Sequence, residues 1–564
     1  MKRFRLAVLL VAVAAVLPAQ DQRVGRGFGG AVAAEEETAA RVGIDILKKG
    51  GNATDAAVAT AFALAVTWPE AGNLGGGGFW LSRDAKGRTL VVDYRETAPR
   101  DARRDLYTRP GPGGVPPSST EGPLASGVPG TVAGLAAAHR RGGRLAWKDV
   151  VEPAVRLARD GFAMTENISQ SIEHAKERLA KDPEAARIYL PGGAAPVPGS
   201  VFKQPDLAAT LAAIRDRGED GFYRGELSRR IEAGQTRQGG LISRGDLARY
   251  EAKIRVPLRF RFAGYDVYTT PAPSSGPVLA EMALLSEALG SARLKTRDVA
   301  SAHLVAEIEK RAFRDRNRYL GDPSFGGVRQ SLFTDPVRIR RLAGTVDPAH
   351  ATPTVKLRPP EPDKPNTTHF SVVDAAGNAV SVTTTLNDSF GNARVAPGLG
   401  FLWNDEMDDF STRPGQRNMY GLVQGKVNEV APGKRMLSSM CPTIVVTAGR
   451  NAFVFGTPGG SRIITTNFQV MLGILLRREP LDAAVAEPRF HQQDNPDEIV
   501  AERGRFDAPW IEGLKKLGHA VIEKDTRDFT FGRVHAIARN PDGSLFAVAD
   551  PRHQGAGLVV RPSP

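Results

Sequence analysis

The sequence predicts a layered α/β protein. Helical periodicity dominates residues 131–233 and 276–320, whereas from residue 367 onward side chains alternate in the manner of strands. The chain has 564 residues, of which 41% are hydrophobic and 24% charged, an ordinary globular composition. A chain of this length can bury a large core without stabilisation by disulfides or metals.

The first elements are indicated by caps and glycines. Residues 35–49 have helical periodicity that stops at a glycine pair, and Asn52 then precedes a second helix with Asp55 three residues on, a variant of the capping box. Residues 79–83 and 89–94 are strand candidates. The glycines at 75–78 lack the Lys-Ser/Thr of a phosphate-binding loop and the spacing of a dinucleotide motif, so they indicate close backbone packing.

The N-terminus has the pattern of a secretory signal. Basic residues at 2, 3 and 5 precede an apolar run over 6–17, and Pro18-Ala19-Gln20 follows. The run is too short to span a bilayer comfortably, which makes an uncleaved anchor the weaker interpretation. We therefore predict a signal peptide at 1–19 and an exported, periplasmic or secreted protein without stable membrane insertion.

Charge and cysteine content exclude several classes of function. The net charge is +13, but basic and acidic residues are interspersed, and the densest stretch, residues 309–318, is interpreted as a solvated helix face. We expect no nucleic-acid partner. The single cysteine, Cys441, excludes an intramolecular disulfide and a cysteine-based zinc site, and its apolar surroundings predict a buried thiol.

A proline-rich segment leads into a predicted hairpin. Residues 347–365 are polar and rich in proline, which indicates an exposed segment, and they run directly into Asn366 and Thr367. Strand alternation follows, with a turn at 374–378. A tight turn would place Thr385 roughly opposite Thr367, with Asn387 just past the strand end. Threonine is also simply a good strand former, so the hairpin alone does not establish a site.

Cleavage between Asn366 and Thr367 would change the chemistry of this strand. The new terminus would carry a hydroxyl nucleophile and an α-amine on one residue, and an amine with a reference pKa of about 8 can serve as general base. This is the principle of an N-terminal-nucleophile hydrolase, which generates its nucleophile by an internal N-to-O acyl shift.

The motifs in the chain resemble those of the γ-glutamyltransferase family, which belongs to the N-terminal-nucleophile hydrolases. The resemblance covers nearly the whole mature chain, and the matching segments occur in the order of the family: 51–56, 93–96, 124–131, 273–276, 366–374, 385–387, 406–410, 437–440 and 456–462. It implies a four-layer αββα sandwich built from two subunits of one precursor. These subunits would be a large one at 20–366 and a small catalytic one at 367–564, which together form one globular unit.

The resemblance also implies roles for the catalytic residues. Cleavage would occur between Asn366 and Thr367, Thr367 would be the nucleophile, and Thr385 would hydrogen-bond its hydroxyl or amine. The backbone N–H groups of Gly459 and Gly460 would form an oxyanion hole, a task for which glycine allows close approach.

A second set of residues would bind the substrate head group. Arg95 would hold the α-carboxylate, aided by Ser438 and Ser439. The α-ammonium would be surrounded by Asn387, Glu406 and Asp409. An aromatic residue in the lid loop at 414–421, Tyr420, would cover the pocket.

The implied activity is acyl transfer without a metal or cofactor. The donor would be glutathione or another γ-glutamyl compound, and the acceptor water, an amino acid or a dipeptide. Two alternatives stay open: a cephalosporin or glutaryl acylase of the same architecture, whose substrates lack the α-amine, and a catalytically inactive exported relative.

Overall fold

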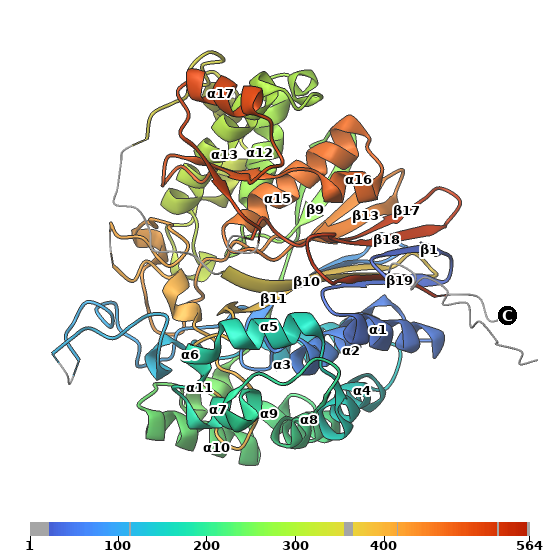
Figure 1. Cartoon of the computed structure of the whole chain (residues 1–564), viewed down its shortest axis with the longest axis vertical. Helices are drawn as coiled ribbons and strands as arrows, with labels where there is room; N and C mark the ends of the chain where they lie inside the picture. The colour runs from blue at the N-terminus through green and yellow to red at the C-terminus, as the bar shows by residue number, and fades with distance from the viewer. Residues whose placement is uncertain (1–21, 112–113, 355–364, 414, 527–529, 561–564) are drawn as a thin grey trace, which may run out of the picture.

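The computed structural model describes residues 22–111, 114–354, 365–413, 415–526 and 530–560. The predicted signal peptide and most of the proline-rich segment before Asn366 lie outside these ranges. Two antiparallel sheets lie face to face at the centre of the molecule, with helices on both outer sides (Figure 1). This is the predicted αββα sandwich.

Strands from both ends of the chain form the first sheet, which we call the β10 sheet. Its spatial order is β19 (Ala556–Val559), β2 (Gly30–Ala34), β10 (Pro365–Asp374), β11 (Ala379–Asp388), β3 (Gly77–Arg83), β4 (Thr89–Asp93) and β7 (Lys253–Arg255). All of its neighbouring strands are antiparallel. The two central strands are those of the predicted hairpin.

The second sheet, which we call the β13 sheet, is likewise antiparallel. Its order is β1 (Val24–Gly27), β18 (Leu545–Ala549), β17 (His535–Arg539), β13 (Arg450–Gly456), β12 (Thr443–Thr447), β9 (Tyr265–Thr269) and β8 (Leu258–Phe262). Two smaller sheets contain β5 (Phe162–Ala163) with β6 (Val201–Phe202), and β14 (Phe490–His491), β15 (Ile499–Glu502) and β16 (Val521–Lys524).

The helices divide into two outer layers (Figure 1). The layer on the β10 sheet contains α1 (Glu37–Lys48), α2 (Ala53–Thr67), α3 (Thr131–Gly142), α4 (Trp147–Asp160), α5 (Glu166–His174), α6 (Lys176–Leu179), α7 (Pro183–Tyr189), α8 (Pro205–Arg217), α9 (Asp220–Tyr223), α10 (Gly225–Gln238) and α11 (Arg244–Arg249). The layer on the β13 sheet contains α12 (Gly276–Ala288), α13 (Val299–Tyr319), α14 (Pro336–Ala343), α15 (Arg462–Met471), α16 (Leu481–Ala486) and α17 (Ala508–Lys516). Among the described residues, no helix combines the length and apolarity needed to cross a membrane.

Local signals in the sequence account for the start of the chain. The Asn52–Asp55 capping box is present, and α2 behind it is buried on all sides because it packs between α1, α4 and the β10 sheet. In β10 the side chains alternate: Phe370 and Val372 join the core under the helices, whereas Val373 joins the core between the sheets. Thr367 therefore lies on the face of β10 that points toward the β13 sheet.

The prediction of a solvated helix face at residues 309–318 is wrong. Most of this charged stretch of α13 is buried, including Glu309 and Lys310 at 0% exposure. The partners come from distant segments: Lys310 pairs with Asp497 at 2.5 Å, and Gln469 donates to Glu309 at 2.9 Å. Helical charge spacing reports which residues share a face, but it does not report that other parts of the chain cover that face.

Candidate active site

The hairpin of β10 and β11 brings two threonine hydroxyls together. The Oγ1 atoms of Thr367 and Thr385 lie 3.2 Å apart, and both residues are buried. The register slips between Asn366 and Thr368, so Thr385 and Leu386 together oppose the single residue Thr367. Alternation along β11 is kept through the bulge: Leu386 packs into the helix-covered core with Val380 and Val382, while Thr385 lies on the Thr367 side.

The end of β11 is held by its own turn. Thr385 accepts a hydrogen bond from the backbone N–H of Asn387 at 2.8 Å. Asn387 has φ of 86°, in the left-handed region that asparagine tolerates better than most residues. Its side-chain amide donates to the carbonyl of Asp405 at 3.0 Å, which ties the hairpin to the acidic segment that follows.

The glycine-rich segment before β3 packs closely against this hairpin, as predicted. A Cβ added at Gly76 would lie 2.1 Å from the carbonyl oxygen of Thr385, and one at Gly75 would lie 2.1 Å from that of Leu402. Only glycine allows this approach. The segment therefore positions β11 rather than binding phosphate.

Gly459 and Gly460 form the turn between β13 and α15. Their φ angles of 134° and 56° lie in the region that favours glycine. β13 ends at Gly456, where an added Cβ would lie 2.3 Å from the ring of His369, which shares the Thr367 face of β10. The turn thus begins beside the strand of Thr367, and the role of its N–H groups as an oxyanion hole remains a prediction.

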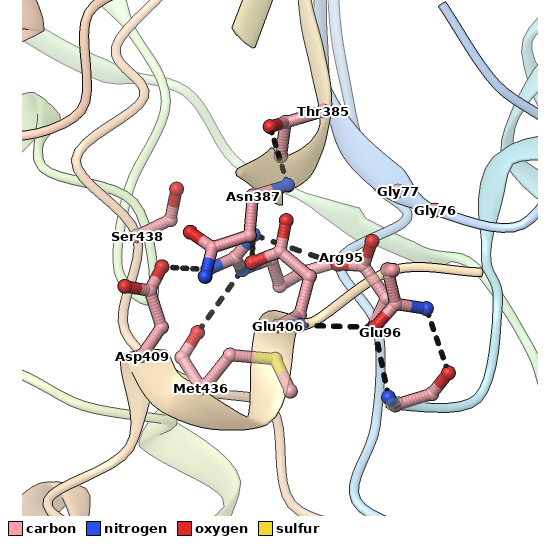
Figure 2. A network of polar contacts seen from close by, with 12 residues as sticks. Gly76, Gly77, Arg95, Glu96, Thr385, Asn387, Glu406, Asp409, Met436 and Ser438 are labelled. Atoms are coloured by element: carbon pink, nitrogen blue, oxygen red, sulfur yellow. Dashed lines mark hydrogen bonds and ion pairs between the residues drawn. The ribbon is translucent and has the colours of Figure 1, made fainter. Parts of the chain in front are cut away.

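Arg95 lies at the centre of a buried charge network (Figure 2). It follows β4, and its guanidinium pairs with Glu406 at 2.5 Å, with Asp409, and with Glu96 at 3.5 Å. Glu406 and Asp409 belong to the short 3₁₀ helix η6 (Glu406–Asp409). The structure thus gathers three of the predicted head-group residues in one place, although in it the arginine binds the two acids themselves.

Burial shifts the pKa values of the charged side chains in this network. It raises the pKa of Glu406 and of Asp409, against the opposing effect of the Arg95 charge. It also raises the pKa of Glu96 to about 7. Burial lowers the pKa of Arg95, but the adjacent carboxylates outweigh it and raise that pKa overall. Carboxylates with perturbed pKa values around a buried cation are typical of functional sites.

Ser438 and Ser439 directly follow Met436 and Leu437, whose carbonyls accept from the Arg95 guanidinium at 3.4 and 3.5 Å. The Ser438 hydroxyl accepts from the backbone N–H of Met440 at 3.1 Å, and the Ser439 hydroxyl accepts from Arg316 at 3.1 Å. Figure 2 shows Ser438 on the Asp409 side of the Arg95 guanidinium. Both serines are therefore close to the predicted carboxylate ligand.

The loop predicted to be a lid contacts Asn387. The Tyr420 hydroxyl donates to the side-chain oxygen of Asn387 at 2.6 Å, and Tyr420 is only 5% exposed. Gln493, which is also buried, donates to the Tyr420 carbonyl at 2.9 Å. This position agrees with the predicted covering role, which remains a prediction.

The model of the gamma-glutamyltranspeptidase family matches residues 39–560. The chain belongs to this family. The match includes every predicted site residue and both strands of the hairpin.

Curated relatives in the family are similar over nearly their full length. The glutathione hydrolase proenzyme of Pseudomonas aeruginosa is 44% identical over 544 residues, which is 95% of each chain. That of Escherichia coli is 41% identical over 532 residues, 93% of this chain and 91% of the relative. A solved cephalosporin acylase from Bacillus halodurans superposes with a TM-score of 0.84 at 26% identity, covering 98% of this chain and 99% of its own.

For three buried polar residues of the site region, no role was predicted from the sequence. They are Glu96, Ser275 and Arg316. Glu96 and Ser275 lie within segments that match the family, but no role was inferred for them. Arg316 lies in the charged stretch of α13 that was interpreted as solvated. The prediction that Cys441 is buried is confirmed, and burial raises the pKa of its thiol to about 12.

Proposed function

We propose that this chain is a self-processing γ-glutamyltransferase and glutathione hydrolase that uses Thr367 as its nucleophile. The observation that carries the proposal is the Thr367–Thr385 hydroxyl pair beside a buried site of mixed charge. The names of the two curated relatives support glutathione as a donor. The proposed subunits are residues 20–366 and 367–564.

Maturation begins when the Thr367 hydroxyl attacks the carbonyl carbon of Asn366. The C–N bond breaks, the nitrogen takes the hydroxyl proton and becomes the free α-amine of Thr367, and Asn366 is left esterified to the Thr367 oxygen. Water then hydrolyses the ester, which leaves a carboxylate on Asn366 and frees the hydroxyl of Thr367. Thr385 assists by holding the attacking oxygen in position.

Turnover uses the same oxygen. The Thr367 α-amine takes the hydroxyl proton as the oxygen attacks the γ-carbonyl of the donor, and it returns the proton to the leaving amine. The N–H groups of Gly459 and Gly460 stabilise the tetrahedral oxyanion. Water or the amine of an acceptor then resolves the γ-glutamyl ester.

Donor binding requires an exchange of ion pairs. The donor α-carboxylate replaces the acidic side chains that pair with Arg95. The donor α-ammonium then forms ion pairs with Glu406 and Asp409. A donor that carries only one of the two charges would leave a buried partner uncompensated, which is costly. The site therefore selects a free amino-acid head group.

The acylase alternative accounts for the overall shape, because a cephalosporin acylase shares the fold. It does not account for two acids facing Arg95, since a glutaryl donor carries no cation that would need them.

The purified protein is expected to release product from a γ-glutamyl anilide, and faster when a dipeptide acceptor is present. The reason is that an amine competes with water for the acyl-enzyme. Absorbance of the released aniline measures the rate, with glutaryl anilide as the control donor. Faster release from the glutaryl compound would favour the acylase alternative.

Export is expected from the basic and apolar pattern of the leader. Fractionation of the source cells should find the mature protein outside the cytoplasm, without residues 1–19. N-terminal sequencing of the large subunit measures the cut. Active protein that is confined to the cytosol and still begins with Met1 would contradict this prediction.

A further inference from the structure

Arg316 is a buried cation close to the head-group site. It lies near the end of α13 and is 1% exposed. Its guanidinium donates to the Ser275 hydroxyl at 2.9 Å, to the Ser439 hydroxyl at 3.1 Å and to the side chain of Asn317 at 3.2 Å. All three partners are neutral, and within the described residues no carboxylate lies in ion-pair contact with it. Burying a charge without a counter-charge is costly, so its position requires a reason.

The contact between Arg316 and Ser439 orients the Ser439 hydroxyl. A hydroxyl has one proton to donate, and the Ser439 oxygen already accepts from Arg316. Its proton is therefore directed away from the guanidinium. Within the described residues the Ser438 oxygen likewise accepts one hydrogen bond, from the N–H of Met440, so the Ser438 hydroxyl also has its proton to donate. The two serines present two O–H donors to an anion.

The contact between Arg316 and Ser275 holds the backbone of the segment that contains both serines. Ser275 accepts from Arg316 and donates to the carbonyl of Ser438 at 2.6 Å. The backbone N–H of Ser275 also donates to the carbonyl of Met440 at 3.1 Å, and that of Ser438 donates to Pro273 at 2.8 Å. Arg316 thus closes a clamp in which residues 273–275 grip residues 438–440.

The charge environment points in the same direction. Burial lowers the pKa of Arg316 to about 10, and the charge of Asp409 opposes this shift. Asp409 pairs directly with Arg95. Two guanidinium groups therefore flank the region in which Arg95 and the serines are proposed to bind a carboxylate.

We infer that Arg316 is a positioning residue for the α-carboxylate of the donor: through Ser439 and Ser275 it aims the hydroxyls of Ser438 and Ser439 at that carboxylate. The inference rests on the proposed function. It assigns a task to the 273–276 segment and to the buried side of α13 at Arg316.

The test compares two donors on the processed protein. One is γ-glutamyl anilide, and the other is its analogue with an α-carboxamide in place of the α-carboxylate. Arg316→Met should raise KM for the carboxylate donor about ten- to a hundredfold, the range for hydrogen bonds to a charged group, with kcat nearly unchanged. KM for the carboxamide donor should change far less. Arg316→Lys should give an intermediate KM, since it keeps the charge but not the fork that reaches both serines.

Arg318→Met is the matched control, since it makes the same change at an exposed position on the same helix and should alter neither donor. A KM that rises equally for both donors, or for neither, would overturn the inference. If Arg316→Met does not self-cleave, Ser275→Ala provides the same comparison, because it breaks the clamp and keeps the arginine. Wild-type protein without γ-glutamyl activity would instead contradict the proposed function.

Discussion

Replacement of Thr367 by alanine is expected to leave the chain uncut and without γ-glutamyl transfer. Alanine lacks the oxygen that is proposed to attack both Asn366 and the donor, so maturation and turnover should be lost together. We expect activity to fall by about 10⁴-fold or more, the scale for removal of a covalent nucleophile. A denaturing gel measures cleavage, and N-terminal sequencing of the wild-type small subunit should begin Thr-Thr-His-Phe.

Two variants serve as controls for this experiment. Thr367→Ser keeps a hydroxyl and should still self-cleave. Thr368→Ala makes the same truncation one residue later, where the hydroxyl is buried without a hydrogen-bond partner among the described residues, and it should also self-cleave. Intact wild-type protein that is fully active would refute the processing scheme.

Replacement of Asp409 by asparagine is expected to reduce kcat/KM for γ-glutamyl anilide about a hundredfold or more. Asp409 is buried and pairs with Arg95, and without its charge the donor ammonium would be buried beside a neutral amide. Loss of one partner of a buried ion pair costs about 3–5 kcal/mol, and about 1.4 kcal/mol corresponds to tenfold in rate. Activity on a glutaryl anilide should fall far less, since that donor has no ammonium.

Asp408→Asn is the matched control for this substitution. Asp408 belongs to the same 3₁₀ helix but accepts from Ser119 and from the N–H of Met419. Its replacement should change the rates with the two donors in equal proportion. Equal losses on both donors in an Asp409→Asn protein that still self-cleaves would show that Asp409 does not bind the ammonium.

The hairpin illustrates how much could be predicted from local pattern. Alternation over β10 and β11 placed Thr367 and Thr385 on one face, and the capping box marked the start of α2. The bulge at which Thr385 and Leu386 together oppose Thr367 was not predicted. A one-residue slip in register leaves the alternation within each strand unchanged, so only packing on both faces selects it.

The charged helix α13 illustrates the opposite case. Its spacing was correctly interpreted as helical, but its charges were assigned to solvent. Their partners come from segments near residues 352 and 497 and from the 273–276 turn, which only the folded chain brings alongside. Charge patterning alone cannot distinguish a solvated face from one whose charges are paired elsewhere.

Local order along the chain thus specified the helical stretches, the first strands and the β10–β11 hairpin, because periods of 3.6 and 2 residues are properties of consecutive residues. The buried polar network around Arg95 and Arg316 is different. Arg95 meets Asp409 across 314 positions, and Arg316 meets Ser439 across 123. No repeat in the sequence relates such residues. They come together only because two sheets and two helical layers close around them, and that same burial removes water and perturbs the pKa values of the acids on Arg95.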